Sequence, residues 1–118
     1  MREKIEIISD DRGSFLLLRL KGELSERTAN YFKQKVQAEI TEHGHTNIVI
    51  DCTDCDYINS VGIGSLTAVA KKLTDIGGSL GVLKPNEQIR DILNLASEAV
   101  IREFRTLEDA AEDFGETA

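Results

Sequence analysis

The apolar and polar positions of the chain first follow the period of a strand and later the period of a helix. Residues 4–9 alternate in part and predict a strand. The apolar run 14–21 predicts a second strand that ends at Gly22. A short polar turn at 10–13 (Asp-Asp-Arg-Gly) separates the two, so we expect an antiparallel hairpin.

Downstream of the hairpin, helical and strand patterns alternate. Ser25 is a candidate N-cap for a helix over 26–43, whose apolar residues recur every three or four positions and whose end is marked by Gly44. The later predicted elements are a strand at 47–52, a polar stretch at 53–60, a helix at 61–76 ended by Gly77-Gly78, a strand at 79–83, a helix at 87–96 after Pro85, a strand at 100–104 and a final helix capped by Thr106. A strand–helix–strand order implies parallel crossovers, so the fold class is α/β with one mixed sheet. The length of 118 residues predicts one domain, 1–118.

Charge and hydropathy exclude several classes of partner. With 14 Lys plus Arg and 21 Asp plus Glu, the net charge is −7, which argues against binding to nucleic acid or to an anionic membrane surface. No apolar run approaches the roughly 18–20 residues that span a bilayer, so we expect no membrane insertion. The charged N-terminus lacks the apolar core of a signal peptide, which favours a cytoplasmic location and reduced cysteines.

Cys52 and Cys55 form a lone Cys-x-x-Cys pattern, which is a weak signal for redox chemistry. A reactive pair needs a helix N-terminus to lower the thiol pKa, and the next predicted helix starts several residues beyond Cys55. His43 and His45 lie at the other end of the strand, roughly 23 Å from Cys52, which is too far for a shared zinc ion. We expect buried structural cysteines, no metal and no cofactor; a dithiol protein remains the rival interpretation.

Other polar clusters give little support to an enzyme. Asp10, Asp11, Asp51, Asp54 and Asp56, with the pair Lys84-Pro85, partly match the acidic pattern of a response-regulator receiver. In a receiver, however, the acid pair leads into a helix, whereas Asp10-Asp11 leads into a strand and reads better as a hairpin turn. The two histidines fit exposed residues at a helix end better than catalytic bases. We therefore expect no enzymatic activity.

The segment 59–65 (Asn-Ser-Val-Gly-Ile-Gly-Ser) lies between a buried strand and a helix, so that Ser60 is at or beside the N-cap. In one interpretation, Ser60 only caps the helix and the glycines only permit close packing. In the other, the loop handles a phosphate, because a helix N-terminus favours an anion. The patterns of nucleotide- and dinucleotide-binding loops are absent, which leaves a phosphate attached covalently to Ser60.

Two segments together resemble the anti-sigma-factor antagonists, the small bacterial STAS-domain proteins. Residues 18–24 (Leu-Arg-Leu-Lys-Gly-Glu-Leu), followed by Thr28-Ala29 and 33–36, are similar to the family's second strand, its Gly-Glu-Leu or Gly-Asp-Leu turn and its first helix. Residues 58–64 are similar to its Asp-Ser-x-Gly-hydrophobic-Gly phosphorylation loop. The resemblance covers about residues 5–112 and implies a mixed sheet with helices mainly on one side.

The resemblance also implies a function. An unphosphorylated antagonist binds an anti-sigma factor, which is also a serine kinase of the histidine-kinase-like ATPase type, and so releases the sigma factor that directs transcription. Phosphorylation of the serine prevents this complex, and a metal-dependent serine phosphatase restores it. Carried onto this chain, Ser60 is the phosphoacceptor. The expected docking face also includes the exposed side of helix 61–76, and the partner-binding residues are Gly22, Glu23, Leu24, Ser25, Tyr57, Ile58, Asn59, Ser60, Val61 and Gly62.

One residue departs from the family pattern: the Asp that precedes the serine is Asn59 here. Asn retains the shape and the capping ability of Asp but lacks its charge, so recognition by the kinase could differ, and Asp56 is a candidate to supply the charge. An alternative function is therefore a STAS-type structural subunit, in a stress-signalling assembly or a lipid-transport complex, which binds constitutively without phosphorylation.

Overall fold

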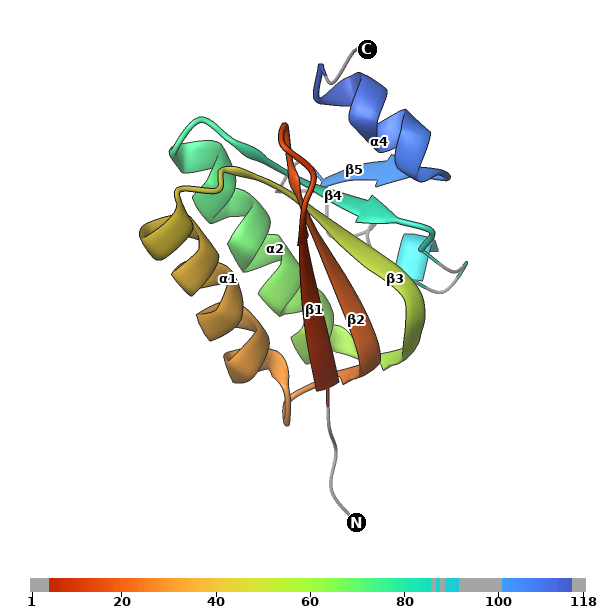
Figure 1. The fold of residues 1–118 in the computed structure, drawn as a ribbon. Coiled ribbons are helices and arrows are strands. Elements are labelled where there is room, and N and C mark those ends of the chain that lie inside the picture. The colour runs from red at the N-terminus through yellow and green to blue at the C-terminus, as the bar shows by residue number, and fades with distance from the viewer. Residues whose placement is uncertain (1–4, 86, 88, 92–100, 116–118) are drawn as a thin grey trace.

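The structure is a computed structural model that describes residues 5–85, 87, 89–91 and 101–115. Over this part of the chain, five strands form one sheet in the order β1-β2-β3-β4-β5 (Figure 1). The strands are β1 (Ile5–Asp11), β2 (Leu16–Leu24), β3 (Asn47–Ile58), β4 (Ser79–Leu83) and β5 (Ile101–Phe104). The helices are α1 (Ala29–His43), α2 (Ser60–Asp75) and α4 (Leu107–Asp113).

The sheet is mixed, as predicted. β1 pairs antiparallel with β2 through the predicted hairpin, and β2, β3, β4 and β5 pair parallel to their neighbours. Two crossovers carry the helices, β2-α1-β3 and β3-α2-β4, and both helices cover the same face of the sheet (Figure 1). The expectation of an α/β fold with helices mainly on one side is confirmed.

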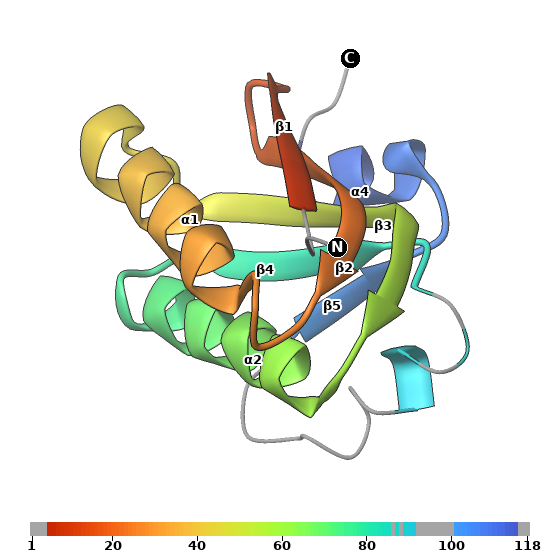
Figure 2. The same ribbon diagram turned by 90° about the horizontal axis from the view of Figure 1, so that it is seen from below.

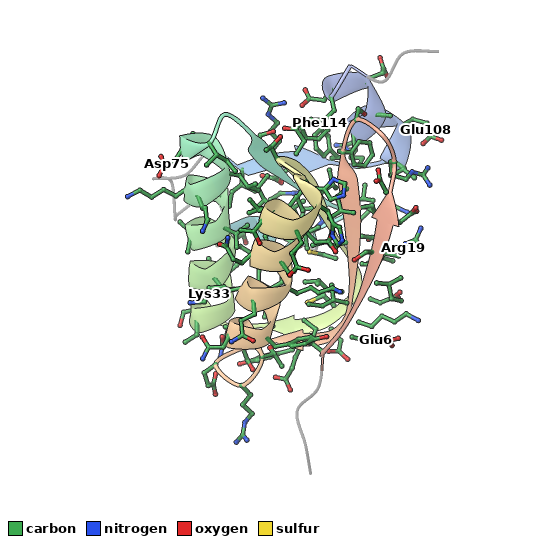
Figure 3. All side chains as sticks on the ribbon, turned by 60° about the vertical axis from the view of Figure 1, so that its left-hand side comes forward. Glu6, Arg19, Lys33, Asp75, Glu108 and Phe114 are labelled. Atoms are coloured by element: carbon green, nitrogen blue, oxygen red, sulfur yellow. The ribbon has the colours of Figure 1, made fainter. Side chains whose placement is uncertain are left out.

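Each face of the sheet has its own apolar core. On the helix-covered face, Leu16, Leu18 and Leu20 of β2 pack with residues of α1 and α2 such as Phe32 and Leu66. On the other face, α4 covers a smaller core, which includes Phe15, Leu17, Val49, Leu83 and Phe104 (Figure 2). Beyond α4 this second face carries charged side chains such as Glu6 and Arg19 (Figure 3). Strand alternation explains the division, because successive residues of β2 point to opposite faces.

β3 is longer than the pattern predicts. The strand was predicted to end at residue 52, before the polar stretch 53–60, but it continues to Ile58, so the predicted end is wrong. The pairing shifts twice along β2, between Arg19 and Lys21 and between Gly22 and Glu23, and each shift leaves one extra residue on β3. These two bulges disrupt the alternation of apolar and polar positions by which a strand is predicted from sequence.

The bulges decide where the cysteines point. Cys52, Cys55 and Ile58 are three residues apart, a spacing that alternates faces in a regular strand. With one extra residue inserted between successive members, all three pack into the core beneath α1 and α2. The polar positions between them, Thr53, Asp54 and Asp56, are exposed.

α1 begins later than predicted, at Ala29, and its N-cap is Thr28 rather than Ser25. Residues 25–28 form a tight turn instead: the Ser25 carbonyl accepts hydrogen bonds from the N–H groups of Thr28 (3.1 Å) and Ala29 (2.8 Å). The Thr28 hydroxyl accepts from the Ser25 N–H (2.9 Å) and donates to the Glu23 carbonyl (2.9 Å), which ties the turn to the end of β2. Ser25 is buried. The helix ends as predicted at Gly44, whose φ of 71° is left-handed.

The C-terminal part follows the prediction where it is described. Thr106 caps α4, and its hydroxyl accepts from the Asp109 N–H (3.0 Å). Ile89, in the helix predicted at 87–96, is buried; residues 92–100 lie outside the described part of the chain. Among the helices described, none is long and apolar enough to cross a membrane.

Candidate functional site

The two motifs that are far apart in sequence lie side by side in the sheet. Gly22 pairs with Cys55, Glu23 with Tyr57 and Leu24 with Ile58, because the ends of β2 and β3 are parallel neighbours. The Asn59 N–H then donates a hydrogen bond to the Leu24 carbonyl (3.3 Å). The Gly-Glu-Leu turn and the Asn-Ser-x-Gly loop therefore form one surface at the carboxyl ends of β2 and β3.

Gly62 allows α2 to start against this surface. A Cβ atom at this position would lie 2.1 Å from the Leu24 carbonyl oxygen and 2.9 Å from an Ile58 side-chain atom. No side chain fits there unless the backbone moves, so glycine is required for the first turn of α2 to pack on the end of β2. Gly22 has a φ of 113°, a conformation that also favours glycine.

Asn59 is the N-cap of α2, and Ser60 is the first residue of the helix. The Asn59 side-chain oxygen accepts the Gly62 N–H at 3.0 Å. The interpretation in which Ser60 caps the helix is therefore wrong, because Asn59 performs that role. Ser60 is exposed, so its hydroxyl faces solvent at the positive end of the α2 dipole.

The amide group of Asn59 binds a carboxylate that the sequence analysis did not identify. Its Nδ2 donates to Oε1 of Glu26, which lies in the turn between β2 and α1. The pKa of the Glu26 carboxyl is lowered, first by a hydrogen bond from its own backbone N–H and then by the bond from Asn59, so the group is anionic at neutral pH. Glu26 is 33 residues from Asn59 in sequence, and no spacing or motif could have indicated the contact.

The ten residues expected to bind a partner divide by exposure. Tyr57 and Val61 are about half exposed (50% and 47%), although both are large and apolar, and Ser60 is exposed beside them. Gly22, Glu23 and Asn59 are half-buried. The side chains of Leu24, Ser25 and Ile58 are buried, as is Gly62, so these four residues shape the surface from beneath and present no side chain to a partner.

Both cysteines are free and buried. Burial raises the pKa of the Cys52 thiol, and the nearby Cys55 and Asp51 raise it further. Burial also raises the pKa of Cys55, whose thiol lies 3.5 Å from the Tyr57 carbonyl. A thiolate is the reactive form, so this environment opposes redox chemistry at neutral pH and favours structural cysteines.

The remaining polar candidates lie away from this surface. His43 is exposed at the end of α1, with Nδ1 3.0 Å from Oε1 of the buried Glu39. His45 is 3.7 Å from Asp11, in the β1–β2 hairpin. In the described ranges, no group of three or more His, Cys, Asp or Glu side chains could hold a metal ion.

The receiver-like acids do not come together either. Asp51 lies on the face of the sheet opposite α1 and α2, where its carboxylate accepts from the Thr53 N–H (3.0 Å) and hydroxyl (2.6 Å). Asp51 and Lys84 do line a common pocket there, with Arg19. Asp10, by contrast, pairs with Arg12 (3.2 Å) in the hairpin, as expected for a turn.

Comparison with known proteins agrees with this geometry. The model of the STAS domain family matches residues 6–110. A protein of Thermotoga neapolitana that is named among the anti-sigma factor antagonists is 25% identical over 92 residues, which cover 77% of this chain and 81% of that protein.

Two solved structures share the fold. An anti-sigma factor antagonist from Mycobacterium paratuberculosis has 23% sequence identity and a TM-score of 0.79, with 94% of each chain covered. The Bacillus cell fate determinant SpoIIAA in its phosphorylated form has 19% identity and a TM-score of 0.71, with 93% of this chain and 98% of that chain covered. Because the family model matches residues 6–110, nearly the whole chain, and the fold agrees with it, the chain belongs to the STAS domain family.

Proposed function

We propose that the chain is an anti-sigma factor antagonist that acts as a phosphorylation-controlled partner switch. In the unphosphorylated form it binds an anti-sigma factor and so releases a sigma factor. The observation that carries the proposal is the exposed Ser60 hydroxyl at the start of α2, on a surface that also exposes Tyr57 and Val61. The names of its relatives support the same function.

The proposed partner is a serine kinase of the histidine-kinase-like ATPase type that is itself the anti-sigma factor. Ser60 accepts the phosphoryl group, and a serine phosphatase removes it. An exposed hydroxyl meets the first requirement of this cycle, because both enzymes must reach the oxygen. The phosphorylated form in which SpoIIAA has been solved supports a covalent phosphate on this fold.

Electrostatics explain how the phosphate would break the complex. A phosphoserine carries a charge of about −1.5 to −2 at neutral pH. At the first position of α2 that charge is tolerated within the protein itself, because the helix dipole and the free N–H groups of the first turn stabilise an anion. In a complex that buries about 800 Å² per partner, the same charge would have to lose its water without a counter-charge, at a cost of several kcal/mol. Each 1.4 kcal/mol weakens binding about tenfold, so one phosphate is sufficient to dissociate the complex.

The Glu26–Asn59 pair supplies the charge that Asn59 itself lacks. Members of the family that the chain resembles have an Asp before the serine, whereas here the Asn59 amide is hydrogen-bonded to the ionised Glu26 carboxylate. The Glu26 carboxylate, in the β2–α1 turn, therefore provides a negative charge beside Asn59, the residue that precedes Ser60. Asp56, the other candidate, is exposed on β3. We infer that Glu26 takes part in recognition by the kinase.

The proposal is tested with purified kinases of this ATPase type from the source organism, mixed with the protein, Mg²⁺ and ATP. We expect mass spectrometry to show one added phosphate, absent in Ser60→Ala and retained in Thr67→Val, which removes a hydroxyl from the same helix. For binding, Ser60→Asp introduces a charge, whereas Ser60→Asn has the same shape without it. Loss of binding in Ser60→Asp alone supports an electrostatic switch; equal binding by all three forms contradicts it.

A second function is favoured by the one departure from the family pattern, Asn59 in place of Asp. A STAS-type structural subunit would bind its partner constitutively and would need no phosphoacceptor. In the same experiment such a protein would bind without ATP dependence and would gain no phosphate, whichever kinase is supplied.

A further inference from the structure

A groove of about 130 Å³ runs between α1 and α2, on the outer side of the helix layer. Its floor is apolar and its rim carries the ammonium groups of two lysines. The floor is formed by Val36, Ile40, Ala68 and Val69, and the rim by Lys33 and Lys72. Figure 3 shows Lys33 on the side of α1 that faces α2.

The charge of this groove is opposite to that of the molecule as a whole. The chain carries a net charge of −7, yet no acidic residue lines the groove. Within the described residues neither Lys33 nor Lys72 forms an ion pair; the Lys72 ammonium donates a hydrogen bond to Gln37 Oε1 across the groove. Two uncompensated cations at the edge of an apolar surface fit an occupant that is apolar at its centre and anionic around it.

The size of the groove selects the kind of occupant. Pockets that enclose a drug-sized ligand have volumes of about 300–1,000 Å³. The volume of this groove, about 130 Å³, is less than half of the lower limit. It can accept one large side chain, such as a leucine or a phenylalanine. A side chain of this kind belongs to a protein segment, whose neighbouring carboxylates can reach the two lysines.

The groove is continuous with the surface around Ser60. Along α2, Val61, Gly64 and Ala68 are exposed and lead from Ser60 to the groove. Eight residues of helix separate Ser60 from Ala68, a distance of about 12 Å. An interface of about 800 Å² is a patch of about 16 Å radius, so a partner that docks over Ser60 also reaches the groove.

We propose that the groove receives an apolar side chain from an acidic segment of the partner that docks over Ser60, with carboxylates of this segment paired to Lys33 and Lys72. This inference rests on the proposed function, since it names a second contact of the same complex. The added contact does not involve Ser60, because the groove is lined by other residues of α1 and α2.

The test measures affinity for the kinase that binds the wild-type protein, with the full chain and without ATP. We expect the double variant Lys33→Glu/Lys72→Glu to bind at least about tenfold more weakly. Ala68→Leu fills the groove without changing charge and should also bind about tenfold more weakly. Arg105→Glu is the charge-reversal control, since Arg105 is exposed between β5 and α4, and α4 covers the face of the sheet opposite α1 and α2. It should stay within about twofold of wild type at about 0.15 M salt. Urea unfolding of each variant checks that the fold is retained.

Failure of this inference differs from failure of the proposed function. If wild type binds the kinase and is phosphorylated, but the groove variants bind equally well, the groove inference alone is wrong. If wild type neither binds a kinase nor gains phosphate, both are wrong. Self-association of wild type that the double variant abolishes, with unchanged kinase affinity, would assign the groove to a second copy of the chain. Binding of decanoate that depends on the two lysines, again with unchanged kinase affinity, would assign it to a lipid; both results overturn the inference.

Discussion

Two glycines in the first turns of α2, Gly62 and Gly64, are expected to respond in opposite directions to the same substitution. Gly62 is buried against the end of β2, where a Cβ atom would lie 2.1 Å from the Leu24 carbonyl oxygen. Gly64 is exposed, and a Cβ atom there would meet nothing within 4 Å. Both lie within α2, so the helix propensity of alanine over glycine favours the substitution at each of them.

The expected change in the free energy of unfolding follows from this difference in surroundings. Alanine is favoured over glycine inside a helix by about 0.8–1.0 kcal/mol. At Gly64 nothing opposes this gain, so we expect Gly64→Ala to raise the free energy of unfolding by about 0.5–1 kcal/mol. At Gly62 the contact must lengthen by about 1 Å to reach a tolerable distance, which separates α2 from β2. Overpacking of a core costs about 1–3 kcal/mol or more, so Gly62→Ala should lower the free energy of unfolding by at least about 1 kcal/mol.

The assay is urea unfolding followed by circular dichroism, with the midpoint and the slope fitted for wild type and both variants. We expect the midpoint to rise for Gly64→Ala and to fall for Gly62→Ala at a similar slope. If Gly62→Ala were as stable as wild type, the close contact between α2 and the Leu24 carbonyl would not exist. If Gly64→Ala were destabilised, the residue would have an internal role that the structure does not show.

Three further predictions follow from single contacts. Asn59→Ala removes the N-cap of α2 and should lower the free energy of unfolding by about 1 kcal/mol, measured in urea. Asn59→Asp keeps the cap but places a second carboxylate against Glu26. The stability of this variant should therefore be reduced at neutral pH, and the reduction should shrink as Glu26 is protonated in acid. Phe32→Ala empties a fully buried position between α1 and the sheet and should cost about 3–5 kcal/mol in the same assay, unless the core collapses into the space. The pKa of the Cys52 thiol is raised in the folded protein, so the unfolded state loses this proton first. Stability should therefore fall as the pH rises above about 8.5, by up to about 1.4 kcal/mol per pH unit from this thiol. Cys52→Ala should make the fall less steep and leave the contribution of Cys55, whose pKa burial also raises; an unchanged slope would contradict burial of the Cys52 thiol.

Elements with a regular period were predicted correctly from the sequence. The hairpin, α2 and β4 have the expected type and nearly the expected bounds, because no irregularity interrupts their apolar pattern: α2 buries one stripe against a single core, and β2 and β4 bury residues on both faces of the sheet. The second half of β3 was missed, because two bulges change the spacing of its buried residues from two to three. The start of α1 was misplaced because Ser25 and Thr28 are both residue types that cap helices, and residues 25–28 form a turn in which the Thr28 hydroxyl binds the Ser25 N–H and the Glu23 carbonyl.

Some features of the candidate site were likewise predicted from the sequence, whereas others were found only in the structure. By itself, the sequence determined the order of strands and helices along the chain, the glycines in the first turns of α2 and Ser60 as the residue that could carry a phosphate, because these depend on local pattern and on neighbours along the chain. Only the tertiary structure decided that Asn59 rather than Ser60 caps α2, that Glu26 supplies the nearby charge and that α1 and α2 enclose a groove with a cationic rim. The Glu26–Asn59 bond and the groove join residues about 30 positions apart or more, and such contacts follow from the packing of elements against one another, which no local period encodes. The cap spans only three residues, but Asn59 and Ser60 are both residue types that cap helices, so only the structure distinguishes them.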